Sequence, residues 1–103
     1  MTVVYLSGPY SGNFFRRCLN IWRAWKKART YWSEGFAVIC PHTNAGFMEG
    51  AATYAEFLAG DVEILKRCDF AYMLKGWRDS NGAMRERQAA EFYGIPILYE
   101  EDK

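Results

Sequence analysis

Hydrophobic runs alternate with amphipathic segments along this chain, as in proteins built from strands and helices in turn. The apolar, β-branched and aromatic segments predict strands at residues 2–6, 36–40, 68–74 and 95–99. Helices are predicted between them, over about 14–34, about 54–67 and a last segment that includes 86–93. This alternation implies right-handed βαβ crossovers. We therefore expect an α/β fold, a small Rossmann-like or flavodoxin-like three-layer sandwich with a parallel sheet of about four strands.

Turn-forming residues mark the ends of the predicted elements. Gly35 stands where a glycine commonly follows a helix, and Pro41 stops the second strand. The helix predicted over about 54–67 is expected to start at Thr53 or Tyr54. Residues 42–52 are rich in Gly, Ala and Asn and are expected to form a loop over the site. With 103 residues and no internal repeat or linker, the chain is expected to form one domain over residues 1–103.

Composition and charge exclude several classes of protein. Half of the residues are hydrophobic, so the chain should fold, and the net charge of +1 makes nucleic acid an unlikely partner. No apolar run approaches the ~20 residues of a membrane span, and the N-terminus does not resemble a signal segment. One histidine and three widely spaced cysteines do not resemble a metal site, so no metal or other cofactor is expected. A reducing cytoplasm fits best.

The first long helix combines aromatic and basic residues. Its apolar positions recur at helical spacing and form a stripe: Cys18, Ile21, Trp22, Trp25, Ala28 and Trp32. We interpret this stripe as core or as a subunit interface, and we expect a homodimer or higher homo-oligomer. The basic residues of the helix are Arg16, Arg17, Arg23, Lys26, Lys27 and Arg29. They are interpreted as a solvated rim, with nucleic acid as the minor alternative.

Three polar loops should converge at the carboxyl ends of the strands, where α/β proteins bind ligands. These loops are 7–13, 42–44 and 77–86. Gly8 and Gly12 would let backbone N–H groups approach an anion or a sugar, although a plain tight turn explains the same glycines. His42 lies in the second loop, where a solvent-exposed histidine is the alternative to a catalytic one.

Two carboxylates are candidates for chemistry. Glu86 is expected in the first turns of the last helix, where the positive end of the macrodipole would favour its charged form. An ionised carboxylate held there can attack an electrophilic carbon, whereas a Glu that only stabilises its helix is the simpler interpretation. Asp61 interrupts an apolar helix face and must be paired, hydrogen-bonded or directed at a cavity. A structural pair with Arg67 is the alternative.

Several short motifs together resemble the nucleoside 2-deoxyribosyltransferase superfamily. They look closest to its 2′-deoxynucleoside 5′-phosphate N-hydrolase branch and to small phage-associated relatives. The motifs are Tyr5-Leu6-Ser7-Gly8 with Gly12 after it, His42 after the second strand, the segment from Asp61 to Asp69, and Ser80-Asn81-Gly82-Ala83-Met84-Arg85-Glu86. The resemblance covers nearly the whole chain.

The resemblance implies an enzyme that cleaves or transfers at the N-glycosidic bond of a (deoxy)nucleoside or its 5′-monophosphate. Glu86 would be the nucleophile that forms a glycosyl-enzyme, and Asp61 would hold or protonate the departing base. Further residues would shape the substrate pocket: Ser7, Gly8, Pro9, Tyr10, Gly12, His42, Trp77, Ser80 and Gly82. Family members that act on free nucleosides have Asp in place of Ser80, so the Ser is similar to the phosphate-accepting branch. Ser11 replaces the first-loop arginine of that branch, a role that Arg16, Arg17 or Arg85 would have to take over.

Two other functions agree with the same sequence. One is a non-catalytic module on this fold that binds or sequesters a nucleotide. The other is a small interaction protein whose Trp-rich helix pairs subunits or captures a partner. We favour the enzyme, because a binding module needs no carboxylate at the head of the last helix.

Overall fold

A four-stranded parallel sheet forms the centre of the computed structural model, which describes residues 1–9, 14–41 and 52–100. The strands are β1 (Val3–Ser7), β2 (Ala37–Ile39), β3 (Phe70–Met73) and β4 (Ile97–Tyr99). The helices are α1 (Phe14–Ser33), α3 (Tyr54–Leu65), the 3₁₀ turn η1 (Trp77–Asp79) and α4 (Asn81–Phe92). The strand order is β2-β1-β3-β4 and every pairing is parallel. The predicted α/β sandwich and its strand number are therefore confirmed.

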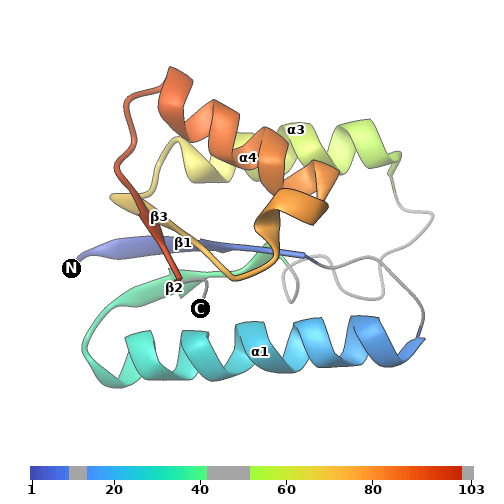
Figure 1. Cartoon of the computed structure of the whole chain (residues 1–103). Helices are drawn as coiled ribbons and strands as arrows, with labels where there is room; N and C mark the ends of the chain where they lie inside the picture. Colours follow the sequence, from blue (N-terminus) through green and yellow to red (C-terminus); the bar gives the residue numbers. More distant parts are fainter. Residues whose placement is uncertain (10–13, 42–51, 101–103) are drawn as a thin grey trace.

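Helices cover both faces of the sheet (Figure 1). The helix α1 lies on one face, and α3 and α4 lie together on the other. Side chains of β1 alternate between these two layers: Val4 and Leu6 belong to the α1-side core, whereas Tyr5 packs with Leu65 and Ala90 on the α3–α4 side. This alternation decides which residues of β1 can reach a site formed by α4.

Local signals in the sequence explain where the helices begin and end. Thr53 caps α3: its side chain accepts a hydrogen bond from Glu56 N at 3.1 Å, and Glu56 Oε1 accepts one from Thr53 N at 2.8 Å. Gly35 has a φ of 91° after α1, as expected for a glycine that ends a helix. Asp69 accepts a hydrogen bond from Val3 N at 2.7 Å and so ties the start of β3 to the start of β1.

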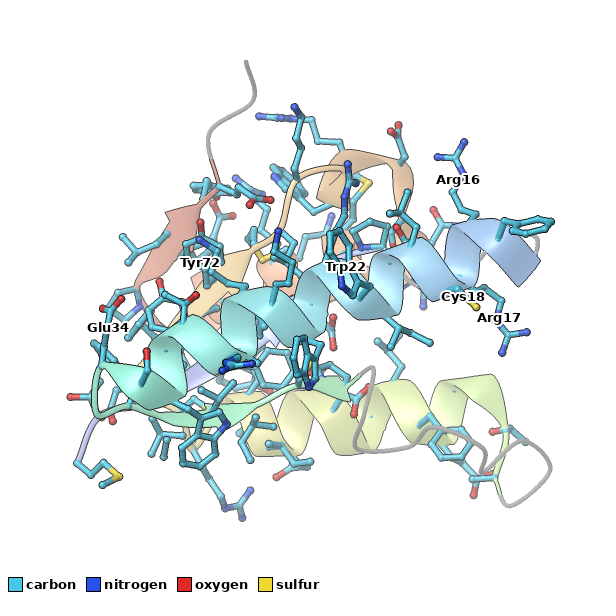
Figure 2. All side chains as sticks on the ribbon, turned by 90° about the horizontal axis from the view of Figure 1, so that it is seen from below. Arg16, Arg17, Cys18, Trp22, Glu34 and Tyr72 are labelled. Carbon is cyan, nitrogen blue, oxygen red and sulfur yellow. The ribbon has the colours of Figure 1, made fainter. Side chains whose placement is uncertain are left out.

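The face of α1 that packs on the sheet differs from the predicted one. Ala24 is fully buried, and Ala28 and Tyr31 pack against the same core. Trp22, Trp25 and Trp32 are 53%, 50% and 56% exposed, and Cys18 is exposed as well. The interpretation of the tryptophan stripe as core is therefore wrong, because the helix packs on the sheet through small alanines and the large rings lie outside this contact. Trp22 is labelled on α1 in Figure 2. None of the helices in the described ranges is long and apolar enough to cross a membrane.

Candidate functional site

The site lies where β1 and β3 end side by side at the centre of the sheet. Ser7 of β1 pairs in register with Met73 of β3, and Leu74 N donates to Ser7 O at 2.7 Å. From this point the chain leaves β1 toward α1 on one face and leaves β3 toward α4 on the other. Such a reversal of strand order creates the crevice in which open α/β sheets bind ligands.

Glu86 of α4 is the buried carboxylate of this site. Only 6% of its surface is exposed. Its Oε1 accepts a hydrogen bond from Ser7 Oγ at 2.6 Å, and its Oε2 accepts one from the Tyr5 hydroxyl. Both donors come from β1, about 80 residues away in the sequence. The two hydroxyls fix the orientation of the carboxylate against the end of the central strand.

Burial sets the protonation of Glu86. Loss of hydration raises the pKa of its carboxyl to about 7, the hydrogen bonds from Ser7 and Tyr5 oppose this rise, and the nearby charge of Asp61 adds to it. The expectation that its place in the helix would favour the charged form is wrong, because burial raises the pKa of Glu86. Glu86 is the sixth residue of α4, beyond the first turn where the dipole acts. Near neutral pH the carboxyl is therefore divided between its two forms.

Tyr5 was not among the site residues predicted from the sequence, although it belongs to a predicted strand and to the first motif of the family resemblance. Its ring is 1% exposed. Burial, followed by the charge of Glu86, raises the pKa of the phenol far above its ordinary value, so the hydroxyl remains a donor. A signal was present: residues 5 and 7 lie on the same face of a strand, so a site at Ser7 also includes Tyr5.

Asp61 is the second carboxylate, and it comes from α3. It is half-buried, and burial raises its pKa to about 6. Its charge raises the pKa of both Glu86 and Tyr5, which places it near them. The alternative partner Arg67 instead forms an ion pair with Glu63 at 3.2 Å. Within the described ranges no basic side chain forms an ion pair with Asp61.

The start of α4 is built around Ser80. This residue is the N-cap of the helix, and its Oγ accepts a hydrogen bond from Ala83 N at 3.2 Å. Gly82 lies in the first turn. Trp77 precedes the cap and is buried beside Met73 and Ala83. Its part in the substrate pocket stays a prediction.

Gly8 follows β1 at a point of close backbone approach. A Cβ atom at this position would lie 2.7 Å from Leu74 Cβ, closer than two carbon atoms can pack. Pro9 lies beside Gly76, which has a φ of 92° and so occupies the left-handed region. Gly8 therefore allows the ends of β1 and β3 to pack closely. Its predicted contact with a ligand stays a prediction. The predicted site residues Tyr10, Gly12 and His42 lie outside the described residues.

The described residues also bear on cofactors. Among residues 1–9, 14–41 and 52–100, no three side chains of His, Cys, Asp or Glu lie close enough together to hold a metal ion. The three cysteines are free thiols: Cys18 is exposed, Cys68 is partly exposed and Cys40 is buried.

Comparisons with known proteins agree with this architecture. The chain is similar to a solved 2-deoxyribosyltransferase from Bacillus psychrosaccharolyticus, with a TM-score of 0.69 and 18% identity over 99% of this chain and 77% of that one. It is also similar to a 2-desoxiribosyltransferase from Leishmania mexicana, with a TM-score of 0.69 and 12% identity over 96% of this chain and 63% of that one. The chain thus has the fold of these enzymes and spans under two thirds of the length of the second.

Sequence comparison places the chain in a family whose function is not defined. No curated protein matches it significantly. Residues 2–99, nearly the whole chain, match the family described as a domain of unknown function, DUF4406. The chain belongs to the DUF4406 family.

Proposed function

We propose that this protein cleaves or transfers at the N-glycosidic bond of a (deoxy)nucleoside or its 5′-monophosphate, with Glu86 as the nucleophile. The observation that carries the proposal is the buried Glu86 carboxylate at the ends of β1 and β3, with one oxygen hydrogen-bonded to Ser7 and the other to Tyr5. A Glu that only stabilised its helix would lie at the surface and would need no partners from the central strand.

The proposed reaction proceeds in two steps. In the first, an oxygen of Glu86 forms a bond to the anomeric carbon while the bond from that carbon to the base nitrogen breaks, and the bonding electrons leave with the base. In the second, water or another base attacks the same carbon and the carboxylate departs. Tyr5 and Ser7 orient the carboxylate for the first step, and their hydroxyls stabilise its returning charge in the second.

Asp61 is proposed to serve the leaving base. With a pKa of about 6, this carboxyl is partly protonated in mildly acidic solution and mostly ionised above neutral pH. The protonated form can donate a proton to the departing nitrogen, and the ionised form can accept hydrogen bonds from an exocyclic amine of the base. Its location on α3, near Glu86 but on a separate helix, suits either role.

The substrate class rests on the resemblance and on the two similar structures. Both of those proteins are 2-deoxyribosyltransferases by description. Ser80 is uncharged and sits at the N-terminus of α4, where backbone N–H groups favour an anion. A 5′-monophosphate is therefore the form of the substrate that we favour, with hydrolysis in line with the resemblance to the N-hydrolase branch.

The decisive experiment measures base release. The protein is incubated with a panel of deoxynucleosides, ribonucleosides and their 5′-monophosphates, with and without a second free base, and the products are separated by chromatography. Free base without an acceptor indicates hydrolysis, and an exchanged nucleoside indicates transfer. We expect Glu86→Gln to abolish both products. The matched control is Glu91→Gln on the same helix, where the replaced side chain is largely exposed and should not affect turnover.

Two results would refute the proposed function. If no member of the panel is turned over by the parent protein, or if Glu86→Gln retains the parental rate while remaining folded, the proposal is wrong. Calorimetric binding of a nucleotide that survives Glu86→Gln without any turnover by the parent would identify the non-catalytic binding module instead.

We further propose a cytoplasmic homo-oligomer. The three free thiols support a reducing compartment. The exposed rings of Trp25 and Trp32 support a subunit contact on that flank of α1. Light scattering tests the contact: Trp25→Glu should lower the measured mass to that of a single chain, and a parent protein that is already monomeric would refute it.

A further inference from the structure

The charges of this protein are divided unevenly, although they nearly cancel overall. Six of the 13 basic residues of the chain lie on α1, and this helix has no acidic residue. The remainder of the chain therefore contains seven basic residues and all 12 acidic residues. The net charge of +1 does not show this uneven distribution, and the excess of positive charge on α1 attracts anions to that helix.

The basic residues at the centre of α1 are not neutralised by the protein itself. Among the described residues, no acidic side chain forms an ion pair with Arg23, Lys26 or Lys27. Basic residues elsewhere do form such pairs: Lys66 and Arg67, just after α3, with Glu63, and Arg87 of α4 with Glu91. Like charges three or four positions apart on a helix repel each other. An external anion would relieve this repulsion.

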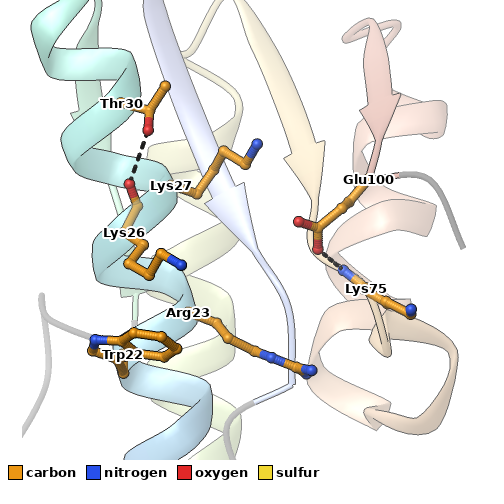
Figure 3. Close-up of a pocket in the computed structure, with 7 residues that line it drawn as sticks. All are labelled: Trp22, Arg23, Lys26, Lys27, Thr30, Lys75 and Glu100. Atoms are coloured by element: carbon orange, nitrogen blue, oxygen red, sulfur yellow. Dashed lines mark hydrogen bonds between the residues drawn. The ribbon is translucent and has the colours of Figure 1, made fainter.

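These basic side chains line a groove of about 450 Å³ between α1 and the ends of β3 and β4 (Figure 3). The lining residues are Trp22, Arg23, Lys26, Lys27, Thr30, Lys75 and Glu100. Arg23, Lys26 and Lys27 extend from α1 toward the opposite wall, where Glu100 Oε1 accepts a hydrogen bond from the backbone N of Lys75 at 2.8 Å. Arg23, Lys26 and Lys27 outnumber Glu100 among the lining residues, so the α1 wall of the groove is cationic.

An aromatic ring borders the same groove. Trp22 is 53% exposed, and Lys26 Nζ lies 4.4 Å from the centre of its ring. Lys27 lies over the ring of Tyr72 in β3, with its Nζ 5.1 Å from the ring centre. Basic side chains beside an accessible indole form the combination that contacts phosphates and stacks an unpaired base.

We propose that this groove binds single-stranded nucleic acid, with phosphates on Arg23, Lys26 and Lys27 and one base stacked on Trp22. The sequence analysis made nucleic acid an unlikely partner from the net charge and interpreted the basic residues of this helix as a solvated rim, with nucleic acid as the minor alternative; the proposal takes up that alternative. A second copy of the chain is a poor occupant, because the same surface on both subunits would bring like charges together. A duplex is a poorer occupant than a single strand, because its bases are not free to stack on the indole.

The proposed surface is separate from the Glu86 site. The helices α1 and α4 cover opposite faces of the sheet (Figure 1). The groove is lined by α1 and by Lys75 and Glu100, and Glu86, Ser7 and Tyr5 are not among its lining residues. Strand binding and glycosidic chemistry can therefore be tested independently. A Glu86→Gln variant should bind a strand as the parent does, and a free deoxynucleoside 5′-monophosphate at a concentration that fills the Glu86 site should not displace it.

The test is fluorescence anisotropy with a short labelled oligothymidylate at roughly 20 mM salt, repeated at increasing salt. Release of counterions from a single strand lowers log K by about 0.7 per phosphate for each unit of log salt, so three contacts predict a slope of about −2. Arg23→Gln with Lys26→Gln should weaken binding at least tenfold and bring the slope to about −0.7. Trp22→Leu should weaken binding about tenfold and leave the slope unchanged, because the loss is in stacking. Arg67→Gln removes one positive charge from the turn after α3 and is the matched control, with no expected effect.

Three results would overturn the proposal. The first is a dissociation constant weaker than about 100 µM at low salt, which is no tighter than the weakest non-specific binding. The second is binding that Arg23→Gln with Lys26→Gln leaves unchanged. The third is equal affinity for the oligothymidylate and for an acidic polypeptide of matched charge, which would show a general polyanion surface. Every variant must be monodisperse and must have the circular dichroism spectrum of the parent. Because Trp22 and Lys26 are exposed, we expect their variants to fold as the parent does.

Discussion

Replacing Glu86 with Gln tests the environment of this carboxyl apart from any activity, because a pKa that differs between the folded and unfolded states makes stability depend on pH. Gln has nearly the same shape, and its amide can still hydrogen-bond with the hydroxyls of Tyr5 and Ser7. Any fixed cost of this replacement is the same at every pH. The change in stability with pH therefore isolates the titration of Glu86.

The sign and size follow from the structure. Burial raises the pKa of Glu86 from 4.5 to about 7, which corresponds to about 3 kcal/mol of free energy. Below about pH 4.5 both states hold the proton and the carboxyl has no effect on pH dependence. Between about pH 4.5 and about pH 7 the unfolded chain loses the proton while the folded chain keeps it, so the free energy of unfolding falls as the pH rises. Above about pH 7 the loss is complete.

The assay is urea unfolding followed by tryptophan fluorescence, in steps from about pH 4.5 to about pH 8. We expect Glu86→Gln to gain about 3 kcal/mol on the parent across this range, or on the order of 10 to 20 °C in Tm. The control is Glu63→Gln. Glu63 is exposed, and hydrogen bonds from Arg67 and Lys66 lower its pKa, so its loss should act in the opposite direction. Parallel curves for the parent and Glu86→Gln would refute the buried, raised-pKa description of the site.

Three further predictions concern the residues around Glu86. Once a substrate is known, kcat/KM should rise with pH through about 7 as Glu86 ionises. Tyr5→Phe or Ser7→Ala should move this midpoint up by about one to two pH units, since each variant removes a hydrogen bond to the charged form. Equal midpoints in the pH–rate profiles of parent and variants would refute this. Asp61→Asn should remove any fall in rate above about pH 6 if Asp61 protonates the base, and should leave the shape of the profile unchanged if it only holds the base. Gly8→Ala should lower the free energy of unfolding by about 1–3 kcal/mol through overpacking, and an unchanged urea midpoint would contradict the close approach of the strand ends.

The sheet could be predicted because each strand is a short apolar segment between clear turn signals. The segment at 68–74 contains β3, the segment at 2–6 covers β1 except for Ser7, and Thr53 and Gly35 flank the helices that they were expected to flank. Strands buried on both faces need continuous hydrophobicity, which a linear pattern shows directly. The strand order does not follow from such a pattern, since it depends on the face to which each crossover helix packs.

The orientation of α1 could not be predicted from the same kind of pattern. Helical spacing gives the tryptophans the greatest hydrophobic weight, yet the helix packs through Ala24 and Ala28, whose small side chains allow close contact with the sheet. Asn20 is buried on this helix as well, and within the described ranges its Nδ2 has no hydrogen-bond partner. The face of α1 that is buried depends on the distance between this helix and the sheet, and a linear pattern of residues does not contain that distance.

The candidate site shows a similar division. Glu86 and Ser7 were recognised from loops that converge, but the charge state of Glu86 was assigned from its helix alone. A helix dipole contributes about 0.3–1 kcal/mol and acts within one turn, whereas burial of this carboxyl contributes about 3 kcal/mol in the opposite direction. The larger effect determines the chemistry, since a carboxylate with a pKa of about 7 is more basic than an ordinary one and still half ionised at neutral pH. Such a group is suited to attack carbon, provided that Tyr5 and Ser7 hold its charged form in place.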